Sequence, residues 1–541
     1  MRKSIKGLSA ILMTSVLAVS ASAAAVTSFA EDTTYTITMQ STTGHTYNAF
    51  QIFKGDVTKN GENKVLTNID WGENVNSDAL VDALKSDSAL GTAFTTAIGT
   101  ETNAKKIAEK VAKQIATYEK DSAEIKAIAQ IIGKNTKGTG KATNGGSFAG
   151  GYYLIEDVTE NLPFDEDAMT SDTISSFLLE VVGNSTPSAK DSTVESHKTV
   201  TETDDTAPTT TPGQKFADYD IGDEIPYELT FTLPSNFTDY VNYPITFTDD
   251  MCAGLSWDGV AEIYYGDNED IGSVTFSSTN STKYAGGKTW TLTTDDLRKA
   301  SYGLENGETI KVVYNATLND KAAINNKGNE NTYNVKFYSD PNNSTTPTPP
   351  TNPDEPTPPG PPTGETPKDT TVVFTYELVF NKTDGKDPLK GADFELEKKI
   401  GGTWTKVTAI HTGTGAKNPT KSAVTADTTQ FTFSGLDAGE YRLTETKVPT
   451  GYNSIDPIEF TVTRTAEGNM VTNLASTGLE MTPTFNATDA KLEAEIINSE
   501  GIELPGTGGI GTTIFYIVGS LMVGGALVLF VVRKRMNIKE Q

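Results

Sequence analysis

Short segments in which apolar and polar residues alternate dominate the chain, and this alternation is typical of half-buried β-strands. Clear cases are TYTITMQ near the start, YELTFTL and IKVVYNATL in the middle, and EYRLTE and KLEAEIIN towards the end. Two stretches, DALVDALKSDSALGTAF and KKIAEKVAKQIATYEKDSAEIKAIAQIIGK, instead space apolar residues by three and four, which predicts helices. We therefore predict a mainly β protein of tandem β-sandwich domains, the first of which has added helices.

The C-terminal end has a different pattern. Residues 510–532 carry no charge and are followed by a basic tail, 533–541, that begins Arg533-Lys534-Arg535. At about 1.5 Å per residue, such a run spans roughly 34 Å as a helix, which is enough to cross a bilayer core. Basic flanking residues mark the cytoplasmic side. The pattern predicts a C-terminal transmembrane helix with a cytoplasmic tail.

The N-terminal end predicts a secretory signal peptide at 1–30. Basic residues precede an apolar run at 8–19, and small residues follow, with cleavage placed after Ala30 or Ala23. The rest of the chain is then exported. It contains a single cysteine, Cys252, so an internal disulfide framework is excluded and any covalent staple has to be of another kind.

Changes in composition divide the exported part into three blocks. We predict domains at 31–187, 188–341 and 371–500, and a proline-rich, extended linker at 342–370. The formal charge of the 541-residue chain is −27, which argues against a nucleic-acid partner because phosphate contacts need clustered Lys and Arg.

Three polar residues of the third block continue apolar strand faces. Side chains alternate between the two faces of a strand, so Lys382 follows Phe380, Glu445 follows Leu443, and Asn498 follows Ile496 on inward faces. A buried lysine tends to lose its proton and a buried glutamate tends to gain one. A neutral amine is a nucleophile, and a protonated carboxyl can polarise an asparagine amide. These residues predict a Lys–Asn amide formed with loss of ammonia, although strands that simply end in polar residues give the same pattern.

The segment YRLTETKVPTGY resembles the E-box of Gram-positive pilins, and the third block resembles an Ig-like, CnaB-type domain with an intramolecular isopeptide bond. In that family the E-box glutamate promotes a bond between a first-strand lysine and a last-strand asparagine. The resemblance implies that Glu445 promotes a bond between Lys382 and Asn498.

The second block resembles the fimbrial isopeptide-formation domain of major pilins, notably in ADYDIGDEIPYELTFTLPSNFTDY and FTDDMCAGLSW. This resemblance implies a bond between Lys198 and Asn331, with Asp249 as the acid. All three residues share the phase of inward apolar neighbours, whereas Asp250 and Asn334 are out of phase and are therefore rejected.

The first block also resembles major-pilin sequence, in YNAFQIFKGD and LLEVVGN. Lys54 follows Phe50 and Ile52, and Glu156 follows Leu154, so these two residues are candidates for a third bond. Its asparagine would be Asn184, which shares its face with Glu180.

The segment before the apolar run matches the LPXTG sorting signal. It consists of Leu504, Pro505, Gly506, Thr507 and Gly508. The resemblance implies that a sortase, which is a cysteine transpeptidase, cuts after the threonine and holds the chain as a thioester. Proline and glycine disfavour helix and keep the peptide extended.

Polymerisation needs an acceptor amine. In backbone pilins this amine belongs to a lysine at the end of the first domain, typically in YPK. In this chain the segment STPSAK occupies the corresponding position, and its lysine, Lys190, is the candidate acceptor. The tyrosine is absent, and alanine precedes the lysine. An ordinary exposed linker lysine is the alternative reading.

The resemblance favours a major structural subunit of a covalent pilus, secreted, held in the membrane as a precursor and then anchored to peptidoglycan. Its partners would be pilus-type and housekeeping sortases, copies of itself, ancillary pilins and a host surface. The alternative is a monomeric wall-anchored adhesin with an isopeptide-stabilised stalk. An exported enzyme finds no support, because the three histidines are isolated and neither HExxH nor GxSxG occurs. We predict no cofactor and no metal site.

Overall fold

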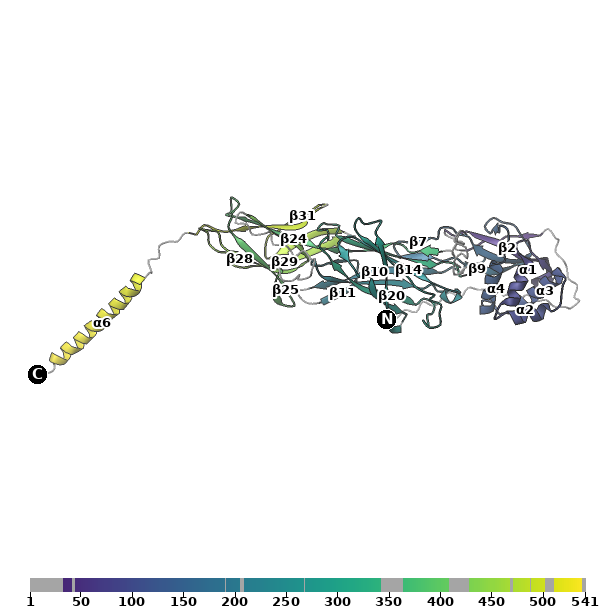
Figure 1. Cartoon of the computed structure of the whole chain (residues 1–541), viewed down its shortest axis with the longest axis horizontal. Helices are drawn as coiled ribbons and strands as arrows, with labels where there is room; N and C mark the ends of the chain where they lie inside the picture. The colour runs from purple at the N-terminus through teal and green to yellow at the C-terminus, as the bar shows by residue number, and fades with distance from the viewer. Residues whose placement is uncertain are drawn as a thin grey trace.

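The computed structural model describes residues 33–40, 44–189, 191–204, 209–266, 268–341, 363–407, 428–467, 470–486, 488–501 and 510–537. The described chain forms an elongated rod in which three β-rich blocks follow one another (Figure 1). The helical first block lies at one end, and the apolar helix α6 (Ile510–Asn537) lies beyond the other end. The mainly β prediction with tandem domains and a C-terminal helix is confirmed.

The first block packs four helices against a five-stranded antiparallel sheet with the order β3-β2-β6-β9 and β4 beside β2. The sheet strands are β2 (Tyr47–Asn60), β3 (Asn63–Trp71), β4 (Lys141–Ala142), β6 (Gly151–Asp157) and β9 (Ser176–Val181). The short strands β1 (Thr34–Tyr35) and β5 (Phe148–Ala149) pair separately. The helices are α1 (Ser77–Ser86), α2 (Gly91–Ile98), α3 (Ala104–Ile115) and α4 (Ala123–Gly133).

Local sequence explains where the helices begin. The side chain of Asn103 accepts a hydrogen bond from the backbone of Lys106 at the start of α3, and Ser122 caps α4 in the same way. The three-and-four spacing then buries one face of each helix, such as Val111 and Ile115 of α3, in the core of the block.

The middle block is a sandwich of two large sheets that enclose one apolar core. The first sheet has the order β17-β16-β20-β13-β10-β8-β7, with β11 beside β10 and β15 beside β20. Its strands are β7 (Phe164–Asp165), β8 (Thr170–Asp172), β10 (Thr193–Asp204), β11 (Thr209–Gln214), β13 (Glu224–Thr232), β15 (Leu255–Ser256), β16 (Val260–Tyr265), β17 (Asn268–Thr275) and β20 (Thr309–Leu318).

The second sheet of the middle block has the order β12-β23-β21-β14-β19-β18, with β22 beside β21. Its strands are β12 (Phe216–Asp218), β14 (Ile245–Met251), β18 (Ser277–Asn280), β19 (Lys288–Thr293), β21 (Asn329–Tyr338), β22 (Thr363–Glu365) and β23 (Asp369–Phe374). A single 3-10 turn, η1 (Phe237–Asp239), connects β13 to β14 among the described residues.

Two predicted boundaries of this block differ from the structure. The hairpin β7–β8 lies within the predicted first domain, but β8 pairs with β10 of the middle sheet. Strand β23 was predicted to open the third domain, but it pairs with β21 and, in parallel, with β12. Both differences concern which strands pair, and pairing depends on contacts between segments that are distant in the chain, so local alternation could not identify these partners.

The third block is a smaller sandwich of a four-stranded and a five-stranded sheet around its own core. The first sheet, in the order β27-β24-β32-β31, contains β24 (Tyr376–Thr383), β27 (Gln430–Leu436), β31 (Thr482–Phe485) and β32 (Ala490–Ile497). The second, in the order β26-β25-β28-β29-β30, contains β25 (Asp393–Ile400), β26 (Thr403–Lys406), β28 (Gly439–Lys447), β29 (Ile458–Glu467) and β30 (Met470–Thr477).

A buried charge cluster joins the middle and third blocks. Lys398 of β25 is fully buried, and its Nζ lies 2.9 Å from Asp220 Oδ2 of the middle block and in contact with Asp437 Oδ1. The backbone N–H of Asp437 also donates to Asp220 Oδ1 over 2.9 Å. Because a buried charge is tolerated only when it is paired, this cluster ties the two sandwiches to each other.

Candidate isopeptide sites and wall anchor

The middle block brings Lys198, Asp249 and Asn331 together between its two sheets. Lys198 comes from β10 of one sheet, whereas Asp249 and Asn331 come from the neighbouring strands β14 and β21 of the other. All three side chains are 0% exposed. The Lys198 Nζ lies 2.6 Å from Asp249 Oδ2. The inward phase predicted for each residue is the geometry observed.

A fourth residue, Tyr314 of β20, completes this cluster, and the sequence reading missed it. Its hydroxyl donates to Asp249 Oδ2 over 2.7 Å and accepts from Lys198 Nζ at 2.8 Å and from Asn331 Nδ2 at 2.9 Å. No sequence signal distinguished this tyrosine, because an aromatic residue on an inward face between Val312 and Ala316 reads as ordinary core.

Burial shifts both charged groups of the middle cluster towards their neutral forms. Desolvation lowers the pKa of Lys198, and the Asp249 carboxylate opposes this effect. Desolvation likewise raises the pKa of Asp249, and Lys198 opposes that shift. Among the described residues, Asp249 Oδ1 and Asn331 Oδ1 are buried without a hydrogen-bond partner. Buried polar atoms are rarely left unpaired, so two in one cluster make this site unusual.

The two rejected neighbours point away from this cluster. Asp250 accepts a hydrogen bond from the Thr289 hydroxyl over 2.8 Å, and the Asn334 amide donates to Glu365. Their side chains lie on the opposite face of the sheet, as the alternation predicts.

The third block places its lysine and asparagine on adjacent parallel strands. Strand β24 runs parallel to β32, Lys382 is opposite Ile496, and the Asn498 backbone N–H donates to the Thr383 carbonyl over 3.1 Å. Lys382 is 1% exposed and Asn498 is 0% exposed. The Lys382 Nζ donates to the carbonyls of Thr383 at 2.8 Å and Ile496 at 2.9 Å.

Glu445 approaches this pair from the facing sheet. The Asn498 Nδ2 donates to Glu445 Oε1 at 2.9 Å and to Oε2 at 3.1 Å, and a further bond of 3.0 Å runs to the Asn453 carbonyl. Asn498 Oδ1 is buried without a partner in the described structure. Desolvation lowers the pKa of Lys382, and the charge of Glu445 opposes the shift. The structure thus brings together all three residues predicted for this block.

The first block does not bring its three candidates together. Glu156 pairs with Asn48, whereas Lys54 pairs with Gly151, and these positions are about 17 Å apart along the ladder. A register shift between Gln51 and Phe53 explains the error, because a bulge reverses the alternation and leaves Lys54 exposed.

The other two first-block candidates have separate environments. Asn184 is exposed and accepts a hydrogen bond from the Thr36 backbone. Burial raises the pKa of Glu156 to about 7, and the nearby Asp340 and Asp157 raise it further. The prediction of a bond among Lys54, Glu156 and Asn184 therefore disagrees with the geometry.

The sorting signal at 504–508 and the candidate acceptor Lys190 lie outside the described residues. Residues immediately before Lys190 are held against the start of the first block, since the Gln40 backbone N–H donates to the Pro187 carbonyl over 2.9 Å. Within α6, the segment Phe515–Arg535 is long and apolar enough to cross a membrane, and its side chains contact little other protein.

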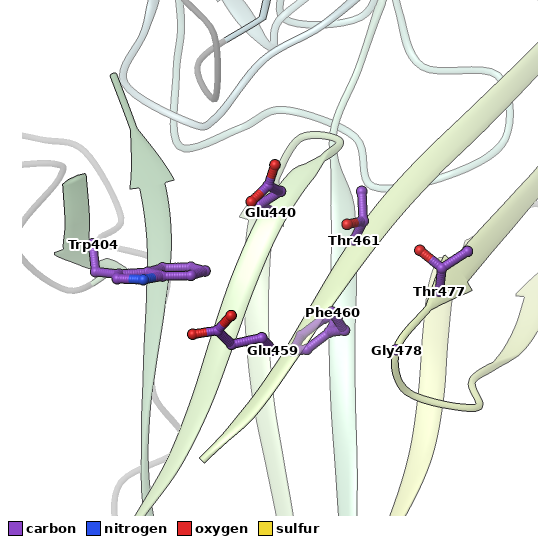
Figure 2. A pocket seen from close by; sticks show the side chains of 7 residues that line it. All are labelled: Trp404, Glu440, Glu459, Phe460, Thr461, Thr477 and Gly478. Carbon is purple, nitrogen blue, oxygen red and sulfur yellow. The ribbon is translucent and has the colours of Figure 1, made fainter. Parts of the chain in front are cut away.

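A shallow hollow on the third block is unrelated to the lysine sites. Figure 2 shows its lining along β28 and β29, beside β26 and at the end of β30, and none of the predicted site residues takes part. The lining residues are Trp404, Glu440, Glu459, Phe460, Thr461, Thr477 and Gly478.

Two family profiles match the chain in its C-terminal half. The prealbumin-like fold domain called SpaA matches residues 376–475, and the LPXTG cell wall anchor motif matches residues 497–537. The first match begins where β24 begins, and so supports the boundary that the strand pairing indicates.

Known proteins give further similarities. Over 384 residues the chain is 25% identical to the trypsin-resistant surface T6 protein of Streptococcus pyogenes serotype M6, covering 58% of this chain and 65% of that protein. Among solved structures, the T6 backbone pilin matches at 16% identity and a TM-score of 0.48, covering 87% of this chain and 100% of that one. The full-length major pilin SpaD of Corynebacterium diphtheriae matches at 19% identity and a TM-score of 0.41, covering 69% and 84%.

These findings agree with one another along the chain. A prealbumin-like domain precedes an LPXTG anchor motif, and an apolar helix with a basic end follows that motif. Together with the similarity to the T6 protein, they support a cell wall-anchored surface protein that contains a prealbumin-like domain.

Proposed function

We propose that this protein is the major structural subunit of a covalently polymerised pilus, stabilised by intramolecular Lys198–Asn331 and Lys382–Asn498 bonds. The observation that carries the proposal is the order of parts along the rod. Two sandwiches, each with a buried lysine and a buried asparagine beside an acid, precede a wall-anchor signal. A shaft subunit under load needs covalent bracing, and its single cysteine rules out internal disulfides.

In each site the lysine loses a proton, and its Nζ attacks the asparagine Cγ. The carbonyl electrons move to Oδ1 and return as the bond from Cγ to Nδ2 breaks. The leaving nitrogen gains a proton and departs as ammonia, and the product is a secondary amide between the two side chains. Desolvation favours the neutral amine. The acid takes up the two protons that the lysine releases in turn, and one of them is passed on to the leaving nitrogen. The roles of Asp249 and Glu445 are therefore those of autocatalytic acids.

Assembly uses separate residues. A pilus-type sortase would cleave between Thr507 and Gly508 and hold the Thr507 carbonyl as a thioester. The amine of Lys190 in another subunit would attack that thioester and release the enzyme thiol. A housekeeping sortase would transfer the last subunit to peptidoglycan. Ancillary pilins and a host surface are further partners in this scheme.

A denaturing gel of cell-wall extracts tests the assembly. Wild type should give a ladder of covalent multimers. Disrupting Thr507 should remove the ladder and the wall anchoring together, because it removes the acyl donor. Lys190→Ala should remove the ladder and leave single subunits on the wall. Lys190→Arg should behave like Lys190→Ala, since a guanidinium stays protonated and cannot attack.

Two outcomes would contradict the proposal. A ladder that persists in Lys190→Arg would move the acceptor to another lysine. A single wall-bound band in wild type, with an active pilus-type sortase present, would favour the monomeric adhesin.

A further inference from the structure

Tyr314 joins the three residues of the middle cluster through one hydroxyl. The hydroxyl contacts the lysine nitrogen, the aspartate oxygen and the asparagine nitrogen at 2.8, 2.7 and 2.9 Å. Among the described residues, no hydrogen bond joins Asp249 directly to Asn331. The path from the acid to the leaving nitrogen therefore runs through the tyrosine.

The ring of Tyr314 is held independently of that hydroxyl. It stacks on Trp257 with centroids 4.1 Å apart and on Tyr227 with centroids 5.2 Å apart. Burial raises the pKa of Tyr314 well above its ordinary value, so the phenol stays protonated at neutral pH. A hydroxyl that keeps its proton can still pass one on while accepting another.

We propose that Tyr314 is a catalytic residue that relays a proton from Asp249 to the departing nitrogen of Asn331. This inference rests on the proposed Lys198–Asn331 bond. Lys198 first gives a proton to Asp249, and its neutral amine then attacks Asn331 Cγ. Asp249 passes its proton to the Tyr314 oxygen as Tyr314 gives its own proton to Nδ2.

The remaining steps account for every proton and charge in the reaction. The bond from Cγ to Nδ2 breaks and ammonia leaves, while the former lysine nitrogen loses its second excess proton to Asp249. Of the two protons that Lys198 gives up, one ends on ammonia and the other stays on Asp249. The net charge of the site is zero before and after the reaction, and no further reactant is needed.

Comparison with the third block explains why only the middle block needs a tyrosine to relay the proton. There Glu445 contacts the Asn498 amide nitrogen directly, at 2.9 and 3.1 Å, so the acid reaches the leaving group without help. Aspartate has one methylene fewer than glutamate, and the tyrosine hydroxyl spans the gap in the middle block.

The test measures bond formation in the full chain without sortase. Newly made protein is pulse-labelled with heavy lysine, chased, denatured, digested and searched by mass spectrometry for branched peptides. Tyr314→Phe keeps the stacked ring and removes only the hydroxyl. It should slow formation of the Lys198–Asn331 peptide by about 100-fold, the lower range for loss of general acid–base catalysis. The Lys382–Asn498 peptide of the same molecules should form at the wild-type rate.

Tyr333→Phe is the matched control. Tyr333 is another fully buried tyrosine of the middle block, and its hydroxyl donates to the Thr230 carbonyl over 3.1 Å instead of to the cluster. The control should form both bonds at the wild-type rate. A wild-type rate in Tyr314→Phe, or equal slowing in both variants, would overturn the relay. Wild-type protein without the branched peptide would overturn the proposed bond itself, which separates the two failures.

Discussion

The middle and third blocks each combine a lysine, an acid and an asparagine, but they arrange these residues differently. In the middle block the acid holds the lysine, with Asp249 2.6 Å from Lys198 Nζ. In the third block the acid, Glu445, accepts a hydrogen bond from the Asn498 amide instead. Lys382 donates to two backbone carbonyls. For the two bonds proposed above, the difference implies that protons need a path between lysine and amide, whereas the position of the acid on that path can vary.

Burial also differs between the two sites. Every member of the middle cluster is enclosed, whereas Glu445 is half-buried near the rim of its sandwich. Desolvation favours neutral lysine and neutral acid, so the enclosed cluster is the more strongly biased towards the reactive pair. The third block compensates with direct contact between its acid and the amide.

The largest expected effect comes from removing each acid. Asp249→Ala should abolish the Lys198–Asn331 bond and leave Lys382–Asn498 intact, and Glu445→Ala should do the reverse. Each variant should regain the mass of one ammonia in an intact-mass measurement. By analogy with other crosslinks, losing a bond that closes a loop on the order of 100 residues should lower stability by about 5 kcal/mol. If the wild-type protein already has the unmodified mass, no ammonia has been lost and neither proposed bond forms.

A third buried lysine sharpens the comparison. Lys398 is as enclosed as the two site lysines, but its described charged partners are Asp220 and Asp437. We expect Lys398 to form no crosslink in peptide maps. Lys398→Ala should destabilise the chain by about 3–5 kcal/mol in denaturant titrations, because two buried carboxylates lose their cation.

Lys399→Ala is the control for that variant. Lys399 pairs with Glu440 at 2.7 Å on a partly exposed surface, so its loss should cost less than about 1 kcal/mol. Similar midpoints for the two variants would show that the buried cluster does not secure the junction.

Lengthening the acid of the middle block should partly convert its arrangement into that of the third block. In Tyr314→Phe, adding Asp249→Glu should recover about tenfold in the rate of bond formation, equal to about 1.4 kcal/mol of barrier. The added methylene brings a carboxyl closer to Asn331, although overpacking an enclosed site opposes full recovery. The rate at which the branched Lys198–Asn331 peptide forms measures the recovery. No recovery would mean that the shorter side chain of aspartate is not the reason why the middle block uses a tyrosine.

The smallest effect should come from the out-of-phase neighbours. Asp250→Ala and Asn334→Ala remove side chains from the far face of the sheet, so both variants should keep the Lys198–Asn331 peptide. Peptide mapping that found Asn334 bonded to Lys198 would contradict both the phase argument and the observed geometry.

Strand periodicity, used together with the resemblance to pilin domains, found most residues of the two clusters. Because alternate residues face the same side, Lys198, Asp249 and Asn331 could be assigned inward positions before any strand partner was known. The same reasoning failed for Lys54, where one bulge reversed the alternation. Periodicity is a local property, and a single inserted residue is enough to invalidate it downstream.

The sequence by itself determined the β class, the helical insertion, the apolar anchor helix and the inward faces, because propensity and alternation act over a few residues. Tertiary structure alone decided that β23 joins the middle sandwich, that Lys398 is buried between two blocks, and that Tyr314 lies among three reacting side chains. Each of these depends on pairing or packing between segments distant in the chain. Such partners are chosen by the free energy of the whole assembly, which no local pattern encodes.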